Sequence, residues 1–141
     1  MRAITVRQPW AWAIMHGGKD VENRSRNIAG KYLGPIAITA ALQVDPQAWL
    51  PNYTLQDSTH LAHFTPRGVV LGVVDLTDVH AMWADDDGRC DRCESPWAQR
   101  SPYHLTLANP RPLPRPIPVR GRLGLWTLPD DIAAQVEEAL Q

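Results

Sequence analysis

The sequence has few cysteines, one phenylalanine and almost no net charge. Its 141 residues include two cysteines, and the formal net charge is −1. Two cysteines exclude the disulfide-rich scaffolds typical of small secreted proteins. A near-zero charge excludes attraction of the whole molecule to nucleic acid as the main source of its function, so any such affinity has to be local.

Long apolar runs are also missing. No run approaches the roughly 18 residues of a membrane helix, and the first ten residues lack the apolar core of a signal peptide. With 44% hydrophobic and 21% charged residues, the composition is typical of a globular protein. We therefore expect one domain over residues 1–141, located in the cytoplasm and without a membrane partner.

The chain is instead rich in proline and tryptophan, with 13 and 6 residues. Five prolines alternate from Pro110 to Pro118, which removes every second backbone donor and excludes a helix or a central strand there. We expect an extended edge segment. A third hypothesis is that a protein with an SH3-like groove recognises this segment.

The remaining pattern predicts several short strands and two or three helices. Strands are expected at residues 2–7, 19–26, 36–38, 69–79, 103–107 and 121–126, and helices from Pro9 to Gly17, at 45–50 and at 129–140. Residues 51–64 are expected to be loop or irregular helix, and 84–102 a loop. The strand 69–79 is apolar on both faces and therefore central, and Gly72 within it marks a bulge or a close backbone approach. The pattern predicts an α+β fold, mostly β, built as a small β-barrel with flanking helices.

Charged residues dominate the segment from Lys19 to Arg26. A strand places Asp20, Glu22, Arg24 and Arg26 on one side, where they cannot face a dry core. Lys19, at the junction of a helix and a strand, can extend its ammonium into a cleft. A glutamate at position 22 accepts hydrogen bonds from an amino group such as cytosine N4, and Arg24 offers a fork to phosphate or a base edge. The alternative is a salt-bridge cluster that holds the first helix on the barrel.

Two other side chains have both a structural and a functional interpretation. Trp10 either packs in the core or stacks on an unpaired base. Asp75 interrupts an apolar strand and either faces solvent at the strand end or pairs with Lys19 or Arg24. Near Glu22, it would share acid and base roles or bind a divalent ion.

The two cysteines form a lone C-x-x-C, Cys90-Asp91-Arg92-Cys93. A closed zinc site needs two more ligands, and only His80 and His104 are plausible ones. A redox pair would require a thioredoxin-like context that the chain lacks. We expect ordinary reduced loop thiols and assign no metal, with Cys90 and Cys93 as the candidates if one is bound.

A motif near the N-terminus connects the chain to a known family. Arg7-Gln8-Pro9-Trp10-Ala11 precedes the pattern G-x-K-x-x-E-x-R, which is matched by Gly17, Lys19, Glu22 and Arg24. Later landmarks are Gly34-Pro35, Gly72-Val73-Val74 and the segment 121–126. Over about residues 3–128 the chain resembles the ASCH domain, a branch of the PUA-like superfamily. The resemblance implies a PUA-like small β-barrel, a cleft beside the first helix and RNA-related ligands.

The activities that this resemblance implies are varied. Some members are RNA-binding modules, others resemble small ribonucleases, and one branch hydrolyses N4-acetylcytidine with a threonine nucleophile at the position of Glu22, activated by the lysine that matches Lys19. A glutamate cannot act as that alcohol nucleophile. Many relatives also carry arginine at the position of Leu33 and histidine at that of Thr39.

The residues and the resemblance together predict binding of RNA or a modified nucleoside. The expected binding residues are Gln8, Trp10, Lys19, Glu22, Asn23, Arg24 and Arg26. The alternative is an enzyme, either an N4-acetylcytidine-type amidohydrolase or a metal-assisted ribonuclease, with Lys19, Glu22 and Asp75 as catalytic residues. A binding protein needs no cofactor, whereas the ribonuclease would use a divalent metal.

Charge is unevenly distributed along the chain. Residues 1–31 carry six Lys or Arg and two acids, and residues 109–124 carry four Arg and no acid. Residues 75–94 carry seven acids and two Arg, and residues 125–141 carry four acids and no basic residue. This pattern predicts a small basic pocket on an otherwise acidic molecule.

Overall fold

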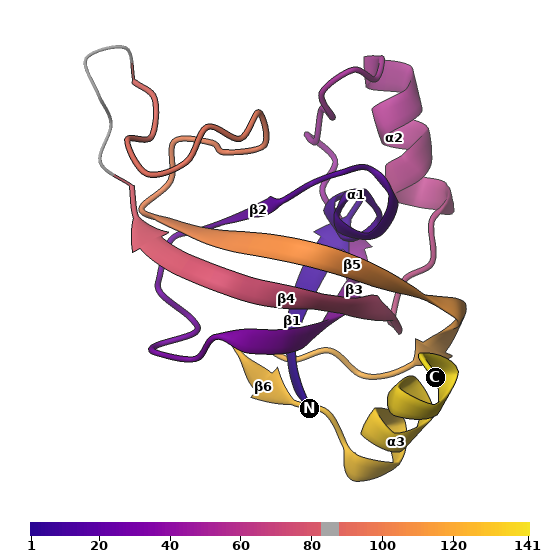
Figure 1. Cartoon of the computed structure of the whole chain (residues 1–141). Helices are drawn as coiled ribbons and strands as arrows, with labels where there is room; N and C mark the ends of the chain where they lie inside the picture. Colours follow the sequence, from indigo (N-terminus) through magenta and orange to yellow (C-terminus); the bar gives the residue numbers. More distant parts are fainter. Residues whose placement is uncertain (83–87) are drawn as a thin grey trace.

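The computed structural model describes residues 1–82 and 88–141, and within them the fold is α+β and mostly sheet (Figure 1). The strands are β1 (Arg2–Gln8), β2 (Val21–Arg24), β3 (Gly34–Val44), β4 (Val69–Ala81), β5 (Tyr103–Pro118) and β6 (Trp126–Thr127). The helices are α1 (Trp10–His16), α2 (Leu55–Phe64) and α3 (Asp130–Ala139). The predicted loop 84–102 is irregular over its described part, and residues 84–87 of it lie outside the described residues.

The six strands form one sheet in the order β2-β5-β4-β3-β1-β6. β1 runs parallel to β3, and the other neighbours are antiparallel. The α+β, mostly β class is confirmed, but the sheet of the predicted small β-barrel is not closed, because β2 and β6 remain its two edges over the described residues. The edge strands are only four and two residues long, which limits the backbone that could pair across the gap.

Alternation along the strands divides the core into two layers. Ile36, Ile38, Val74 and Leu76 face a cluster that also contains Ile14 and Met15 of α1. Ala37 and Val73 point the other way, into a cluster with Val136 of α3. α1 and α3 therefore cover opposite faces of the sheet (Figure 1).

β4 occupies the central position that its two apolar faces predicted, and Gly72 marks a close approach within it. A Cβ atom at Gly72 would lie 2.5 Å from the carbonyl oxygen of Arg111 and 2.5 Å from Sδ of Met15. The pairing register between β4 and β5 also shifts beside this glycine, between Val70 and Gly72. Of the two alternatives for this position, the close approach is confirmed, and the shift in register accompanies it.

The alternating prolines lie in the second half of β5. Only its first residues pair with β2, so the proline-containing half pairs with β4 alone and has an open edge, as predicted. Proline lacks a backbone N–H donor, and this loses no ladder hydrogen bond where the strand has no neighbour on that side.

Three local predictions are wrong. Residues 45–50 form a turn rather than a helix, because the Asp45 carboxylate accepts hydrogen bonds from Gln47 N (3.0 Å) and Trp10 Nε1 (2.8 Å). Regular helix appears instead at α2, where the Thr54 hydroxyl accepts from Asp57 N at 2.9 Å as an N-cap. Of the expected strand 121–126, only the last residue is in β6.

In the part of the chain that the structure describes, no helix is long and apolar enough to cross a membrane.

Candidate functional site

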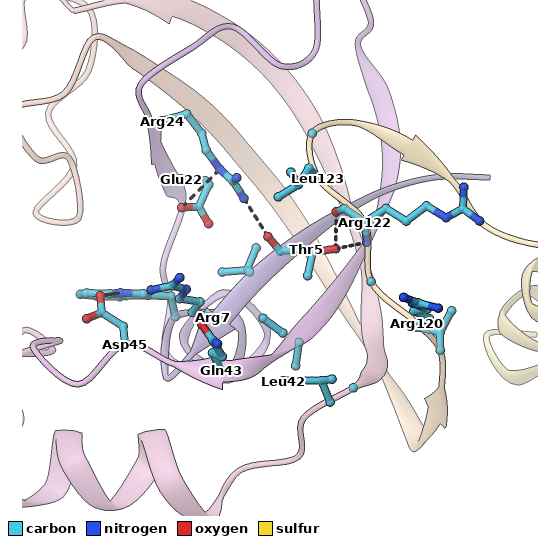
Figure 2. A pocket seen from close by; sticks show the side chains of 18 of the residues that line it. Thr5, Arg7, Glu22, Arg24, Leu42, Gln43, Asp45, Arg120, Arg122 and Leu123 are labelled. Carbon is cyan, nitrogen blue, oxygen red and sulfur yellow. Dashed lines mark hydrogen bonds and ion pairs between the residues drawn. The ribbon is translucent and has the colours of Figure 1, made fainter.

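A cleft of about 1220 Å³ opens between β1, β2, the end of β3 and residues 118–124 (Figure 2). Its lining includes five cationic and two acidic side chains: Arg7, Lys19, Arg24, Arg120, Arg122, Glu22 and Asp45. Both basic stretches of the sequence contribute to it. The cleft is therefore a local concentration of positive charge on a molecule with a net charge of −1.

Lys19 lies deep in this cleft, with 4% of its surface exposed. It follows Gly18, whose φ of 78° turns the chain out of α1 toward β2. Its Nζ donates a 2.5 Å hydrogen bond to the carbonyl oxygen of Val21 and lies 5.0 Å from the ring centre of Trp10 and 5.8 Å from that of Trp97. Burial lowers the pKa of the Lys19 ammonium, while the nearby charges of Glu22 and Asp20 oppose this shift.

Glu22 and Arg24 share one face of β2, as their spacing predicted. Nε of Arg24 lies 4.0 Å from Oε1 of Glu22, and Nη2 of Arg24 donates to the carbonyl oxygen of Thr5 at 3.0 Å (Figure 2). Among the described residues, Oε2 of Glu22 and Nε of Arg24 are buried without a hydrogen-bond partner. Buried polar atoms normally have partners, so these two are poised for groups that the protein does not supply.

Trp10 lines the cleft beside Lys19 and is half-buried. Its Nε1 donates a 2.8 Å hydrogen bond to Oδ2 of Asp45, which fixes the ring orientation. The ring centre lies 6.5 Å from that of Trp97, at an interplanar angle of 85°. Trp10 is therefore both packed against the protein and accessible from the cleft.

Asn23 also lines the cleft, but both ends of its amide are used within the protein. Nδ2 donates to the carbonyl oxygen of Trp97 at 3.0 Å, and Oδ1 accepts from the backbone N–H of Gln99 at 2.8 Å. Asn23 thus fastens residues 97–99 to β2, and Gln99 becomes part of the cleft wall.

Two of the expected binding residues lie outside the cleft lining. Gln8 is fully buried, with its side-chain oxygen Oε1 accepting from Trp12 N and its Nε2 donating to the Pro66 carbonyl, each at 2.8 Å. It secures the start of α1. Arg26 is exposed two residues beyond the end of β2.

Asp75 is also outside the cleft lining and does not pair with Lys19 or Arg24. It lies in β4 and forms a 2.8 Å ion pair with Nη2 of Arg111, while Nδ2 of Asn109 donates to it at 3.3 Å. These hydrogen bonds, that of Arg111 first, lower the pKa of the Asp75 carboxyl group. The register of β4 with β5 explains the arrangement, because it pairs Asp75 with Ala108 and Val73 with Arg111, which places Asn109 and Arg111 beside Asp75.

Several cleft residues were not identified from the sequence. Arg120 and Arg122 belong to the basic stretch 109–124, whose charge was the available signal. Thr5 is placed by long-range contacts, since its hydroxyl donates to the Arg122 carbonyl at 2.8 Å and accepts from Trp126 Nε1 at 3.1 Å. No pattern in the sequence indicated that Gln99 would line the cleft.

Thr39, the position at which the family resemblance led us to expect histidine, is fully buried. Its hydroxyl bonds to the Ile4 carbonyl at 3.1 Å and to the Thr5 hydroxyl at 3.0 Å. It therefore joins β3 to β1 and does not line the cleft.

A second group of polar side chains lies where β4 ends and β5 begins. The ligand atoms of His80, Cys90, Cys93 and His104 all lie within 4.8 Å of one another. Burial, followed by the neighbouring Cys90 thiol, raises the pKa of Cys93 to about 11. The two histidines named as completions of the C-x-x-C are thus brought to it by the fold.

Comparison with known proteins gives a consistent picture. A family model of the ASCH domain matches residues 4–108. The fold is similar to that of a crystal structure of ASCH from Zymomonas mobilis, with a TM-score of 0.57, 16% identity and coverage of 99% of this chain and 95% of that chain. Two mutant proteins of the same ASCH give TM-scores of 0.60 and 0.55 at 17% and 15% identity; 99% of this chain is covered in both, and 98% and 96% of theirs. No curated protein sequence matches.

Proposed function

Because the chain belongs to the ASCH domain family, we propose that its cleft binds RNA or a modified nucleoside, with an unpaired base seated against Glu22. The family supports an RNA-related function in general. The finer proposal rests on the buried Oε2 of Glu22, which belongs to a cleft-lining residue and has no partner in the part of the chain that the structure describes. An exocyclic amino group, such as N4 of cytosine, is a donor that would satisfy it.

The surroundings of Glu22 suit the rest of a nucleotide. Trp10 is held by Asp45 at the cleft wall, where its ring offers a surface for base stacking. Exposed arginines at positions 7, 120 and 122 lie around the same cleft. Arginine binds phosphate through a bidentate fork, so these side chains would hold the backbone while Glu22 selects the base.

A nucleoside titration tests the base contact. Cytidine, N4-acetylcytidine and uridine would be added to the labelled protein while amide chemical shifts are followed. We expect cytidine to bind more tightly than uridine, because uridine presents the acceptor O4 where cytidine presents a donor. The Glu22→Gln variant should lose this preference, and Arg26→Ala, outside the cleft, should keep it. The proposal fails if no amide of residues 8–26 shifts with any of these ligands or with a short single-stranded RNA.

Salt dependence tests the phosphate contacts. For single-stranded RNA the logarithm of affinity falls with that of salt concentration by about 0.7 per phosphate neutralised. Arg120→Ala should reduce this slope by about 0.7. Arg115→Ala is the matched control, because Arg115 is exposed in the same basic stretch but does not line the cleft. Equal slopes for the two variants would argue against phosphate binding at this cleft.

The lowered pKa of Lys19 favours hydrolysis as a second candidate function. In that reaction Glu22 would take a proton from water as it attacks the acyl carbon of an acylated cytidine, and Lys19 would give a proton to the departing amino nitrogen. Incubation with N4-acetylcytidine should then release cytidine, and Lys19→Ala and Glu22→Gln should abolish release. RNA with and without Mn²⁺ tests the ribonuclease alternative. If the protein binds these ligands but releases no product, only the binding function is supported.

A further inference from the structure

The register of the sheet brings two histidines together at the end of β4. His80 in β4 lies opposite His104 in β5, and their ring centres are 5.3 Å apart. Both side chains are buried. The chain from residue 88 to 102 then carries the C-x-x-C back to this point, so that Cys90 lies beside His80 and Cys93 beside His104.

Two sulfur-to-nitrogen distances within the group are close to those of a tetrahedral metal site. Sγ of Cys90 lies 3.5 Å from Nε2 of His80, and Sγ of Cys93 lies 3.3 Å from Nδ1 of His104. Zinc bonds of about 2.3 Å to sulfur and about 2.0–2.1 Å to nitrogen, at a tetrahedral angle, put the two atoms about 3.6 Å apart. All four ligand atoms lie within 4.8 Å, so a single ion is within reach of each.

Hydrogen bonds outside the cluster orient both imidazole rings. Nδ1 of His80 bonds to Oδ2 of Asp78 at 2.8 Å, and Nε2 of His104 bonds to the carbonyl oxygen of Gln99 at 2.6 Å. In each ring the nitrogen that faces the cysteines is therefore left as the metal ligand. Carboxylate and carbonyl partners on the far nitrogen are the usual surroundings of a zinc-bound histidine.

We propose that His80, Cys90, Cys93 and His104 bind one zinc ion in a closed structural site. Two thiolates and two imidazoles match the Cys₂His₂ donor set of such sites, and the two-residue spacing of the cysteines is typical of them. With four protein ligands the ion keeps no open position, so it holds the fold and takes no part in a reaction.

The site fixes one wall of the cleft. Gln99, whose carbonyl oxygen bonds to His104, lines the cleft, and its backbone N–H donates to Asn23 of β2. The neighbouring Trp97 packs against Trp10 and Lys19. The zinc ion would therefore anchor residues 88–102 at one end, while Asn23 anchors them at the other. This inference is independent of which ligand the cleft binds.

Metal content is the first test. The full chain would be purified in reductant without a metal-affinity tag, and zinc would be measured by elemental analysis. We expect one zinc per chain, and loss of it in Cys93→Ser and in His104→Asn. His63→Asn is the matched control and should retain the ion, because His63 is exposed on α2 outside the cluster. Zinc well below one per chain that is not restored by added zinc, or full retention in Cys93→Ser, overturns the proposal.

Cobalt substitution and chelation keep the test valid if a variant fails to fold. The wild-type chain loaded with Co²⁺ should show the visible absorption and thiolate charge-transfer bands of a tetrahedral site. A strong chelator should lower the melting temperature and shift the amides of Asn23, Trp97 and Gln99. Three results would each contradict a structural zinc site. They are octahedral cobalt spectra, a melting temperature that the chelator does not change, and a chain that is isolated with Cys90 and Cys93 in a disulfide and binds no metal once that disulfide is reduced.

Discussion

Nη2 of Arg24 donates a 3.0 Å hydrogen bond to the backbone carbonyl oxygen of Thr5. Arg24 ends the edge strand β2, and Thr5 lies in β1, with β5, β4 and β3 between these two strands in the sheet. The Arg24 side chain thus connects β2 with β1 across the opening of the sheet. The same arginine lines the cleft, so the contact that holds β2 in place also shapes the cleft.

Replacing Arg24 should loosen this connection. A hydrogen bond from a charged donor contributes about 1.5–3 kcal/mol, so we expect Arg24→Ala to lower the free energy of unfolding by roughly that amount. Urea unfolding at pH 7 measures it. Arg26→Ala, two residues further on at an exposed position, should change the value by less than about 0.5 kcal/mol. Equal losses in the two variants would show that the bond to Thr5 does not hold β2.

Glu22 should contribute to binding at the expense of stability. Glu22 is 8% exposed, its Oε2 has no partner among the described residues, and Nε of Arg24 lies 4.0 Å from its Oε1. Glu22→Gln keeps the shape and removes a charge whose burial is not offset by a hydrogen bond at Oε2, so we expect a free energy of unfolding equal to or above that of the wild type. Ligand affinity should fall about tenfold or more with the loss of a charge-assisted hydrogen bond. A clear loss of stability would indicate that the charge serves the fold.

Lys19 should titrate below its ordinary pKa of 10.5, because burial disfavours the ammonium. The chain has only two lysines, so Lys31→Arg leaves Lys19 as the single lysine side chain for titration by NMR. Between the folded and unfolded pKa values the unfolded state binds more protons, so the free energy of unfolding should rise with pH through that window. In Lys19→Met this rise should disappear. A midpoint at or above 10.5 would contradict the desolvation of Lys19.

Asp75 should affect acid stability and leave binding intact. Its hydrogen bonds from Arg111 and Asn109 hold its pKa below the ordinary 3.8. The stabilisation is complete above the unfolded pKa and is lost as pH falls through the folded one. We expect Asp75→Asn to be less stable at pH 7 by a few tenths to about 1 kcal/mol, with the difference vanishing in strong acid. Thermal unfolding from pH 2 to pH 7 measures this.

Two controls complete that experiment. Glu137→Gln, at an exposed position on α3, should show no such pH-dependent difference. Nucleoside affinity should be the same in Asp75→Asn and in the wild type, because Asp75 does not line the cleft. A large loss of binding in Asp75→Asn would instead favour the catalytic role considered from the sequence.

Local features could be predicted because they depend on residues close together in the chain. The two-residue spacing of Glu22 and Arg24 places them on one face of any strand, and the apolar faces of residues 69–79 require a central position. The turn at Asp45 was missed because its carboxylate bonds to Trp10, 35 residues earlier. The open sheet was missed because closure depends on how strands far apart in sequence pair.

The sequence by itself determined the family, the charged face of β2, the edge character of the proline segment and the pair of cysteines. Only the tertiary structure decided which distant residues meet. Strand register places His80 opposite His104, loop paths bring Cys90 and Cys93 to them, and residues 118–124 join β2 around one cleft. Side-chain type and short-range periodicity can be read directly from the sequence, whereas strand register and loop path follow from the packing of the whole core.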